Sequence, residues 1–359
     1  MAASRWLSLL VLDLMACGGG GEEVARIARQ WTHEGPATTA PPGVGPERRV
    51  LVLLKDAAPE GGGQLVTLDD GTGRPIEGPF PAPLTDHAPV FSSGKIVVLT
   101  KIGKIVAMNL AGETLYTVPD GNGLGLSSPL AVAPDGSLRV GTTSGLLLGF
   151  AIEDGRELFR VDTQGAIASP LAVAPDGTTY AATDLGRLVG VDARGVVVFD
   201  RTVTPPASGP SVAASGEILV GEGSGVRIFG ADGGERAAHA RAARVVGTRL
   251  LDEGRFLAWG EDGVVEILRL DGGVETRFTT ASASPPPVYA PPLPLPGGAF
   301  GVLDHLGKLH LVGADGVERT TFALAAEPLR EVAQASTASV LLVAVGRTIE
   351  AVRFTMTVE

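Results

Sequence analysis

Residues Ser128–Gly136 read SPLAVAPDG, and the same letters return at Ser169–Gly177, 41 positions later. Degenerate copies of the opening begin at Ala88 and Gly209. A Pro-Asp-Gly sequence favours a tight turn, because Pro presets φ and Gly tolerates positive φ. A unit that recurs about every forty residues is typical of repeat folds, in which each unit is one supersecondary structure.

A second turn glycine recurs once in each unit. Successive members of this series are 38 to 44 residues apart. They are Gly63, Gly103, Gly145, Gly186, Gly225, Gly263, Gly307 and Gly346. This regular spacing predicts eight copies of one structural unit.

Short apolar runs rich in β-branched residues separate the turns, as at Lys95–Leu99 and Val340–Val345. We expect four strands in each unit: one before the Pro-Asp-Gly turn, two around the turn glycine, and one after an Asp-Gly turn such as Glu153–Gly155. The fourth strand carries an aromatic residue in five units: Tyr116, Phe159, Phe199, Phe278 and Phe322. Four-stranded units of this length form propeller blades, so we predict an all-β, eight-bladed β-propeller of four-stranded antiparallel blades.

The order of these features resembles the PQQ-like β-propeller repeat over about residues 24 to 359. The stretch that is most similar to the signature of that repeat is Leu68–Gly73. In that family the fourth-strand aromatic docks one blade against the next and is often Trp, whereas here most copies are Phe. The resemblance implies a single propeller domain, with the Phe rings filling the gaps between blades.

The ends of the chain predict how the ring closes. The last unit lacks a fourth strand, and residues 24–31 place Trp31 where that strand would carry its aromatic. We expect residues 24–31 to pair with the strand near Thr348–Phe354, which removes both free sheet edges. An amphipathic helix over Glu22–Gln30 is the alternative, with seven blades and a partial one as its consequence.

The first residues predict export and a lipid anchor. An apolar stretch, Trp6–Leu12, follows Arg5 and leads to Leu14–Cys17, which resembles the lipobox of bacterial lipoproteins. Asp13 and Met15 depart from that pattern. We expect a signal peptide over residues 1–17, lipidation of Cys17, and a Gly-rich tether over residues 18–23. By resemblance to lipoprotein sorting, Gly18 favours the outer membrane, facing the periplasm.

Several classes of function are disfavoured. The net charge of −11 and the lack of a basic run argue against nucleic-acid binding. Quinoprotein dehydrogenases share the repeat, but their Ca²⁺ ligands, the Trp below the quinone and the paired cysteines cannot be matched here. We therefore expect no catalytic residues, no cofactor and no metal. His305 and His310, which flank a tight turn, are interpreted as polar edge residues.

The sequence favours a non-catalytic, monomeric envelope lipoprotein that serves as a protein-interaction scaffold. By resemblance, its nearest analogue is the lipoprotein propeller subunit of the outer-membrane β-barrel assembly machinery. One alternative is a ligand- or sugar-binding propeller, or a small hydrolase or lyase, with a pocket lined by His87, His239 or His305. A sensory or surface-display domain is a third possibility that the sequence does not separate from the first.

Overall fold

The computed structural model describes residues 23–34, 42–45, 49–55, 63–69, 72–82, 87–100, 102–118, 125–205, 208–280, 291–304, 306–324, 332–336, 340–345 and 348–358. Within these ranges the regular structure consists of β-strands and one 3₁₀ turn, η1 (Pro296–Gly298). No helix in these ranges has the length and apolar character needed to cross a membrane.

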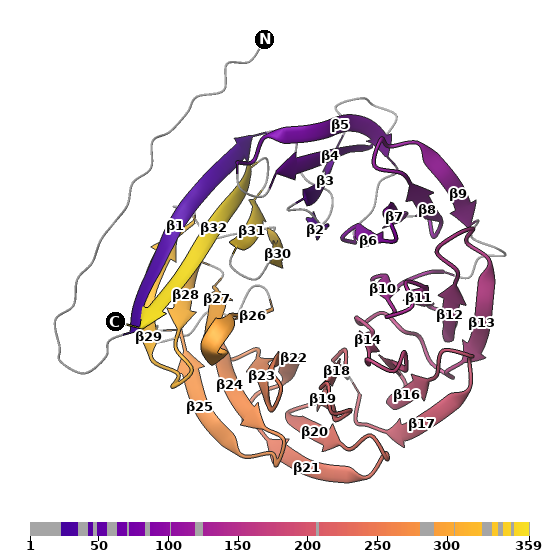
Figure 1. Ribbon diagram of the computed structural model, residues 1–359. Coiled ribbons are helices and arrows are strands. Elements are labelled where there is room, and N and C mark those ends of the chain that lie inside the picture. The colour runs from indigo at the N-terminus through magenta and orange to yellow at the C-terminus, as the bar shows by residue number, and fades with distance from the viewer. Residues whose placement is uncertain are drawn as a thin grey trace.

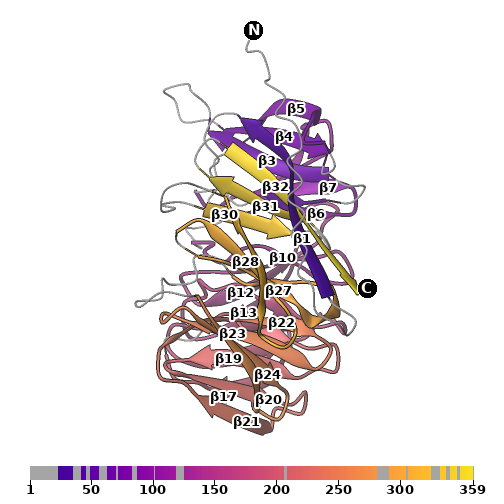
Figure 2. The ribbon, with the colours of Figure 1, turned by 90° about the vertical axis from the view of Figure 1, so that its left-hand side faces the viewer.

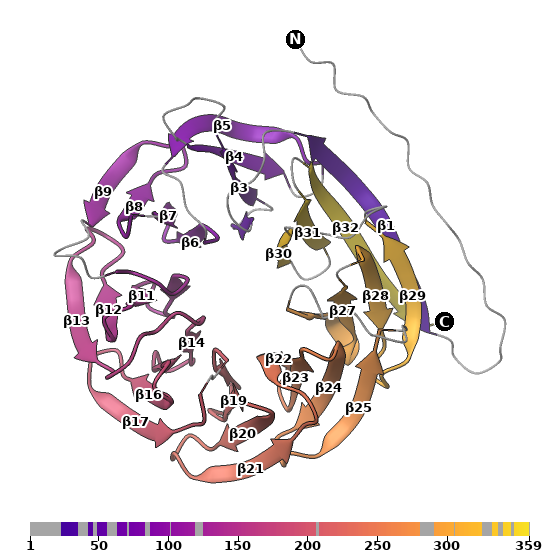
Figure 3. The same cartoon turned by 180° about the vertical axis from the view of Figure 1, so that it is seen from behind.

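The described strands form eight four-stranded antiparallel sheets arranged around a common axis (Figure 1, and from behind in Figure 3). We number the sheets in chain order, with strands running from the innermost to the outermost. Sheets 1 to 4 are β2 (Gly43–Val44), β3 (Arg49–Lys55), β4 (Gly63–Asp69), β5 (Pro75–Ala82); β6 (Val90–Ser92), β7 (Lys95–Leu99), β8 (Ile105–Met108), β9 (Thr114–Val118); β10 (Ala131–Val132), β11 (Leu138–Gly141), β12 (Leu146–Phe150), β13 (Glu157–Asp162); and β14 (Ala172–Val173), β15 (Thr179–Ala182), β16 (Arg187–Val191), β17 (Val197–Thr202). Sheets 5 to 8 are β18 (Ser211–Val212), β19 (Ile218–Glu222), β20 (Gly225–Phe229), β21 (Glu235–Ala240); β22 (Val245–Asp252), β23 (Arg255–Gly260), β24 (Val264–Arg269), β25 (Val274–Thr279); β26 (Leu293–Pro294), β27 (Phe300–Leu303), β28 (Lys308–Val312), β29 (Glu318–Ala323); and β30 (Val332–Ser336), β31 (Val340–Val345), β32 (Thr348–Val358), β1 (Glu23–Glu34). The predicted all-β propeller of four-stranded antiparallel blades is confirmed.

The N-terminal strand closes the ring. β1 pairs antiparallel with β32 from Glu23 opposite Val358 to Glu34 opposite Thr348, which confirms the predicted pairing and rules out the helix alternative. Figure 2 shows β1 and β32 side by side at this closure. β1 begins at Glu23, and residues 18–22 of the expected tether lie outside the described residues. Closure pairs the backbone groups that an open ring would leave at its edges.

Neighbouring sheets pack through alternate residues of the same strand. In β12, Leu148 faces sheet 2 and clusters there with Val97, whereas Leu147 faces sheet 4 and clusters with Val189. Both faces of each inner strand are therefore buried, and this explains why the strand sequences are apolar at consecutive positions. The core consists of the layers between sheets.

Each outer strand contains a β-bulge at the same position. In β13, Phe159 pairs with Gly149 and Glu157 pairs with Phe150, so Leu158 between them is unpaired. The same one-residue shift occurs in the outer strand of every sheet. The bulge residues are Ile76, Leu115, Leu158, Val198, Arg236, Glu275, Arg319 and Gln30. A bulge bends an edge strand and redirects the side chain of its extra residue.

The residue after the bulge is the docking aromatic in sheets 2, 3 and 4. It lies opposite a small residue of the third strand: Tyr116 opposite Ala107, Phe159 opposite Gly149, and Phe199 opposite Gly190. Trp31 opposite Ala351 has the same register in sheet 8. The ring of Phe159 lies against Gly195 in the third turn of the next sheet, as the aromatic resemblance implied.

Sheets 5, 6 and 7 have no aromatic residue at the docking position. Phe278 and Phe322 stand two residues beyond the docking position, opposite Val265 and Leu309. Sheet 5 has Ala237 at the docking position and a large residue, Ile228, opposite it. In sheet 5 the large side chain is on the third strand and the small one on the fourth, so the layer between sheets 5 and 6 is still filled.

Candidate interaction surface

The turn glycines lie in a series of equivalent turns between the second and third strands. Five of them have left-handed backbone angles: Gly103 (φ 73°), Gly145 (84°), Gly186 (77°), Gly263 (71°) and Gly307 (78°). A side chain at these angles strains the backbone, which explains why glycine recurs there.

Two predicted turn glycines lie elsewhere. Gly225 is the first residue of β20, and Gly223, two residues earlier, has the positive φ of 52° in that turn. Gly63 is the first residue of β4. Gly346 lies outside the described residues, as do Cys17 and His305. The sheet-5 turn is shorter because Glu222 pairs directly with Gly225. The position that requires a positive φ is therefore residue 223.

Four of these turns begin with a buried residue whose side chain accepts a hydrogen bond. Thr100 Oγ1, Thr142 Oγ1 and Thr183 Oγ1 each accept a hydrogen bond from the backbone N–H four residues later, at 2.8 to 3.1 Å. Asp304 Oδ1 does the same for Lys308 N–H at 2.9 Å. The sequence analysis missed these residues, although a Thr or Asp three positions before the turn glycine was the available signal. Side-chain acceptors of this kind fix a turn by satisfying its backbone.

The same turns are hydrogen-bonded to the connections between sheets. The carbonyl oxygens of Gly145 and Gly186 accept the N–H groups of Thr163 and Val203, at 2.8 and 2.9 Å. Asp184 N–H donates to the carbonyl of Ala166, which lies in the connection from the previous sheet, at 3.0 Å. We call this series of turns and connections the turn rim. These bonds link successive sheets along one face of the ring.

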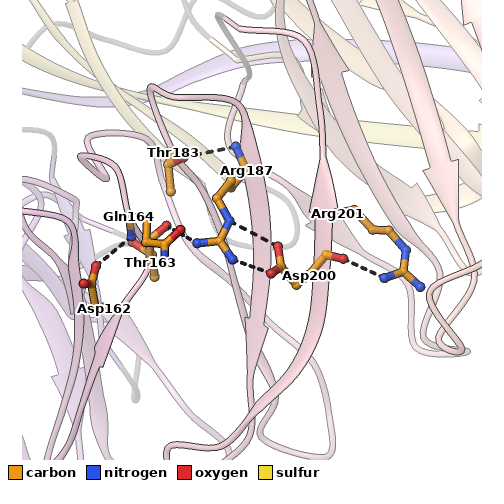
Figure 4. Close-up of polar contacts among 7 residues, drawn as sticks. All are labelled: Asp162, Thr163, Gln164, Thr183, Arg187, Asp200 and Arg201. Carbon is orange, nitrogen blue, oxygen red and sulfur yellow. Dashed lines mark hydrogen bonds and ion pairs between the residues drawn. The ribbon is translucent and has the colours of Figure 1, made fainter.

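Arginine side chains strengthen the turn rim, as Figure 4 shows for sheets 3 and 4. Arg187 forms an ion pair with Asp200 on the neighbouring strand, and its Nη1 donates to the carbonyl of Thr163 at 3.2 Å. In the next sheet, Arg227 Nη2 donates to the carbonyl of Thr202 at 2.7 Å. Both carbonyls lie where an outer strand meets the following connection, so each guanidinium fastens one sheet to the sheet before it.

Three of the turns carry exposed aliphatic side chains at their tips. Ile102, Leu185 and Leu306 are 68 %, 70 % and 40 % exposed, and each directly precedes its turn glycine. Ser144 and Asp262 occupy the equivalent position in the turns of sheets 3 and 6. Side chains at the tip of a rigid turn do not pack in the fold, so these are available to a partner.

The third residue of the third strand is ionisable in sheets 5, 6 and 7. It is Arg227, Glu266 and His310 in these sheets, whereas Leu148 and Val189 occupy the position in sheets 3 and 4. Glu266 is buried and lies 3.1 Å from Arg241 Nε and 2.7 Å from Arg277 Nε. Glu266 also lies 3.0 Å from Nε2 of His239, which is on the outer strand of sheet 5.

The interpretation of His310 as a polar edge residue is wrong. Its side chain is buried, with Nδ1 2.6 Å from Glu318 Oε2 and Nε2 3.2 Å from Asp304 Oδ2. Its ring lies 5.5 Å from that of Phe278 in sheet 6. Burial opposes the charge of the ring, but the two carboxylates outweigh it and raise the pKa of His310. The edge interpretation failed because the sequence does not show that the next sheet covers this position.

His87 and His239, the two described histidines that were expected to line a pocket, lie in different parts of the ring. His239 belongs to the outer strand of sheet 5, and His87 lies in the connection before sheet 2. Among the described side chains, no group of three or more His, Cys, Asp or Glu residues is placed to hold a metal ion. Glu266 contacts residues of sheet 5 and of the connection that follows it, whereas His310 is paired within sheet 7.

Comparison with known proteins agrees with this architecture. The family model described as outer membrane protein assembly factor BamB matches residues 20–158 and 111–289. The crystal structure of BamB from Moraxella catarrhalis is 15 % identical, with 97 % of this chain and 96 % of that chain covered and a TM-score of 0.60. The computationally designed Ika8 protein (14 % identity, coverage 93 % and 100 %, TM-score 0.70) and the C-terminal WD40 domain of Sif2 (11 %, 93 % and 99 %, 0.69) are also similar. At these identities the structures show the fold alone, and no curated protein matches the chain significantly.

Proposed function

Because the chain belongs to the PQQ-like propeller family described as outer membrane protein assembly factor BamB, we propose that it is a non-catalytic scaffold that binds other proteins of the cell envelope. A role in the assembly of outer-membrane proteins is the most specific form of this proposal. The family supplies the class of function, whereas the surface that performs it has to be argued from this chain.

The observation that carries the proposal is the set of exposed aliphatic tips on the turn rim. Ile102, Leu185 and Leu306 occupy one equivalent position on three different sheets. The rim beneath them is held by hydrogen bonds within and between sheets. Apolar groups presented by rigid elements bind partners with little loss of conformational entropy.

A lipid on Cys17 is the second part of the proposal. The signal peptide over residues 1–17 delivers the chain to the envelope, and the lipid holds it at the outer membrane, facing the periplasm. Support comes from the Leu14–Cys17 pattern and from the first described strand, which begins at Glu23, close behind it. Replacing Cys17 with Ala is expected to move the full chain from the membrane fraction to the soluble fraction of the periplasm.

Site-specific crosslinking tests the scaffold role. A photo-crosslinking residue placed at Leu185 in the full chain is expected to capture a defined envelope protein, and the triple variant Ile102→Ser, Leu185→Ser, Leu306→Ser should reduce binding of that protein. Val317→Ser is the matched control, because Val317 is 51 % exposed and lies in another class of turn. If the triple variant binds the captured protein as well as the control does, the turn rim is not the interaction surface.

A further inference from the structure

The bulge residues divide the outer circumference of the ring into two halves. In sheets 1 to 4 they are aliphatic and exposed: Ile76 (44 %), Leu115 (48 %), Leu158 (38 %) and Val198 (57 %). In sheets 5 to 8 they are polar: Arg236, Glu275, Arg319 and Gln30. Figure 1 shows the four strands of the first half, β5, β9, β13 and β17, following one another along the outside of the ring. We call these four aliphatic residues the aliphatic half-ring.

The polar bulge residues have partners within their own sheets. Arg236 and Arg319 each pair with an aspartate of the preceding turn, Asp232 at 3.0 Å and Asp315 at 2.9 Å. Glu275 pairs with Arg255 at 3.2 Å, and Gln30 accepts a hydrogen bond from Arg353 at 3.3 Å. Charged residues on outer strands also discourage pairing with other chains. The aliphatic half-ring has no such charges at the equivalent positions.

Acidic residues lie at the centre of the aliphatic half-ring. Glu153 and Asp154 form the third turn of sheet 3 and are exposed. That turn packs on β9, because a Cβ at Gly155 would stand 2.7 Å from the ring of Tyr116. Burial and the charges of Asp154 and Glu153 raise the pKa of Tyr116 to about 12, which places both carboxylates near that ring.

These two carboxylates differ from their counterparts in sheets 5 and 7. No arginine or lysine among the described residues forms an ion pair with either of them, and the nearest arginine in sequence, Arg156, donates only its backbone N–H to Asp154, at 3.0 Å. The neighbouring Glu157 is already paired with Arg160 at 2.7 Å. The turn therefore adds two carboxylates without a described ion pair to the surface where sheet 3 meets β9.

We propose that the outer surface between β9 and β13 binds an extended protein segment that carries both cationic and aliphatic side chains. Cations would pair with Glu153 and Asp154, and aliphatic side chains would cover Leu115 and Leu158. The charge of this surface disfavours an anionic lipid layer. Because the outer strands curve around half of the ring, a flexible segment can also follow them where a flat membrane cannot.

The inference adds a second surface to the proposed scaffold, and it rests on that function only in requiring a protein partner. A labelled synthetic peptide of alternating Lys and Leu residues is the probe, and a peptide of alternating Glu and Leu is its control. Fluorescence anisotropy with the full chain measures both dissociation constants. We expect the cationic peptide to bind more tightly and to weaken with added salt.

The test variant combines Leu115→Ser, Leu158→Ser, Glu153→Gln and Asp154→Asn, all at exposed positions. It should raise the Kd of the cationic peptide about tenfold, since two ion pairs and two apolar contacts are removed. The matched control, Val317→Ser with Glu261→Gln, replaces exposed residues of sheets 6 and 7 and should leave the Kd unchanged.

Three results would overturn the inference: equal weakening by the control variant, equal binding of the acidic peptide, or binding of phosphatidylglycerol vesicles that the four replacements abolish. The turn-rim triple variant separates the two proposals. If it loses the envelope partner but still binds the cationic peptide, the surfaces are independent. Failure of the crosslinking experiment leaves the peptide result unaffected.

Discussion

Replacing His310 with Leu removes the cation from between two carboxylates. Carboxylate oxygens only accept hydrogen bonds, so both ring nitrogens of His310 donate and the ring is an imidazolium. The variant leaves Asp304 buried without its partner, and losing one member of a buried ion pair costs about 3–5 kcal/mol. Glu318 is partly exposed and can be solvated by water, so most of the cost arises at Asp304.

The pH dependence has a definite sign. The folded-state pKa of His310 is raised, so its stabilisation is complete below the unfolded value of about 6.5 and is lost as pH rises through the folded pKa. Burial alone would raise the pKa of Asp304, but hydrogen bonds from His310 and Lys308 N–H lower it overall from 3.8. The contribution of Asp304 is therefore lost as pH falls below that value. The pair stabilises the fold fully between about pH 4 and 6.5.

Urea unfolding of the full chain between pH 5 and 9 tests this account. Wild type should lose stability as pH rises above 6.5, whereas His310→Leu should be less stable at pH 6 and nearly independent of pH in this range. The double variant His310→Leu, Asp304→Asn should recover most of the loss, because the amide that replaces the carboxylate keeps the oxygen that caps the turn but carries no charge. An unchanged unfolding curve for His310→Leu, or an alkaline loss that persists in it, would refute the reasoning.

Three further changes test the packing and the turn rim by the same measurement. Gly149→Ala should lower the free energy of unfolding by about 1–3 kcal/mol, because its Cβ would stand 2.5 Å from the ring of Phe159. A Cβ at Gly254 meets nothing within 4 Å, so Gly254→Ala should be nearly neutral, and equal effects of the two changes would contradict the packing argument. Thr142→Val should cost about 1 kcal/mol by removing the acceptor of Leu146 N–H, and no loss would show that the cap contributes little. Glu266→Gln should cost about 3 kcal/mol, because it leaves the buried Arg241 with only its longer ion pair to Asp262, at 3.6 Å, and Glu261→Gln on the surface is its control.

The repeat and the closure of the ring could be predicted because local rules determine them. The Pro-Asp-Gly turns and the turn glycines mark the strand ends, and Trp31 marks the missing fourth strand. The error at the turn of sheet 5 came from a shift of two residues, because that shorter turn needs Gly223 rather than Gly225.

The relations between sheets could not be predicted in the same way. His310, Glu266 and Arg241 are polar in sequence, and nothing local shows that a neighbouring sheet buries them. The sequence does not reveal the β-bulges either. Nothing in the letters around Leu158 marks it as an extra residue, and only its pairing with β12 shows this. Burial and register between segments forty residues apart are properties of the closed ring.

The two halves of the ring therefore respond differently to solution conditions. Between sheets 3 and 4 the third strands meet through apolar residues such as Leu147 and Val189, which pH does not affect. Glu266 links sheet 6 through charge to His239 of sheet 5 and to Arg241 in the connection after it. His310 is instead paired with Asp304 and Glu318 inside sheet 7 and contacts sheet 6 through the ring of Phe278, so its protonation acts within sheet 7. The aliphatic half-ring lies on sheets 1 to 4, whereas His310 lies on sheet 7, and Leu158 should keep its position across the pH range in which His310 titrates. Crosslinks formed at Leu158 should then be insensitive to pH between 6 and 9, whereas those formed at Leu306, in the turn that Asp304 caps, should decline as His310 loses its proton.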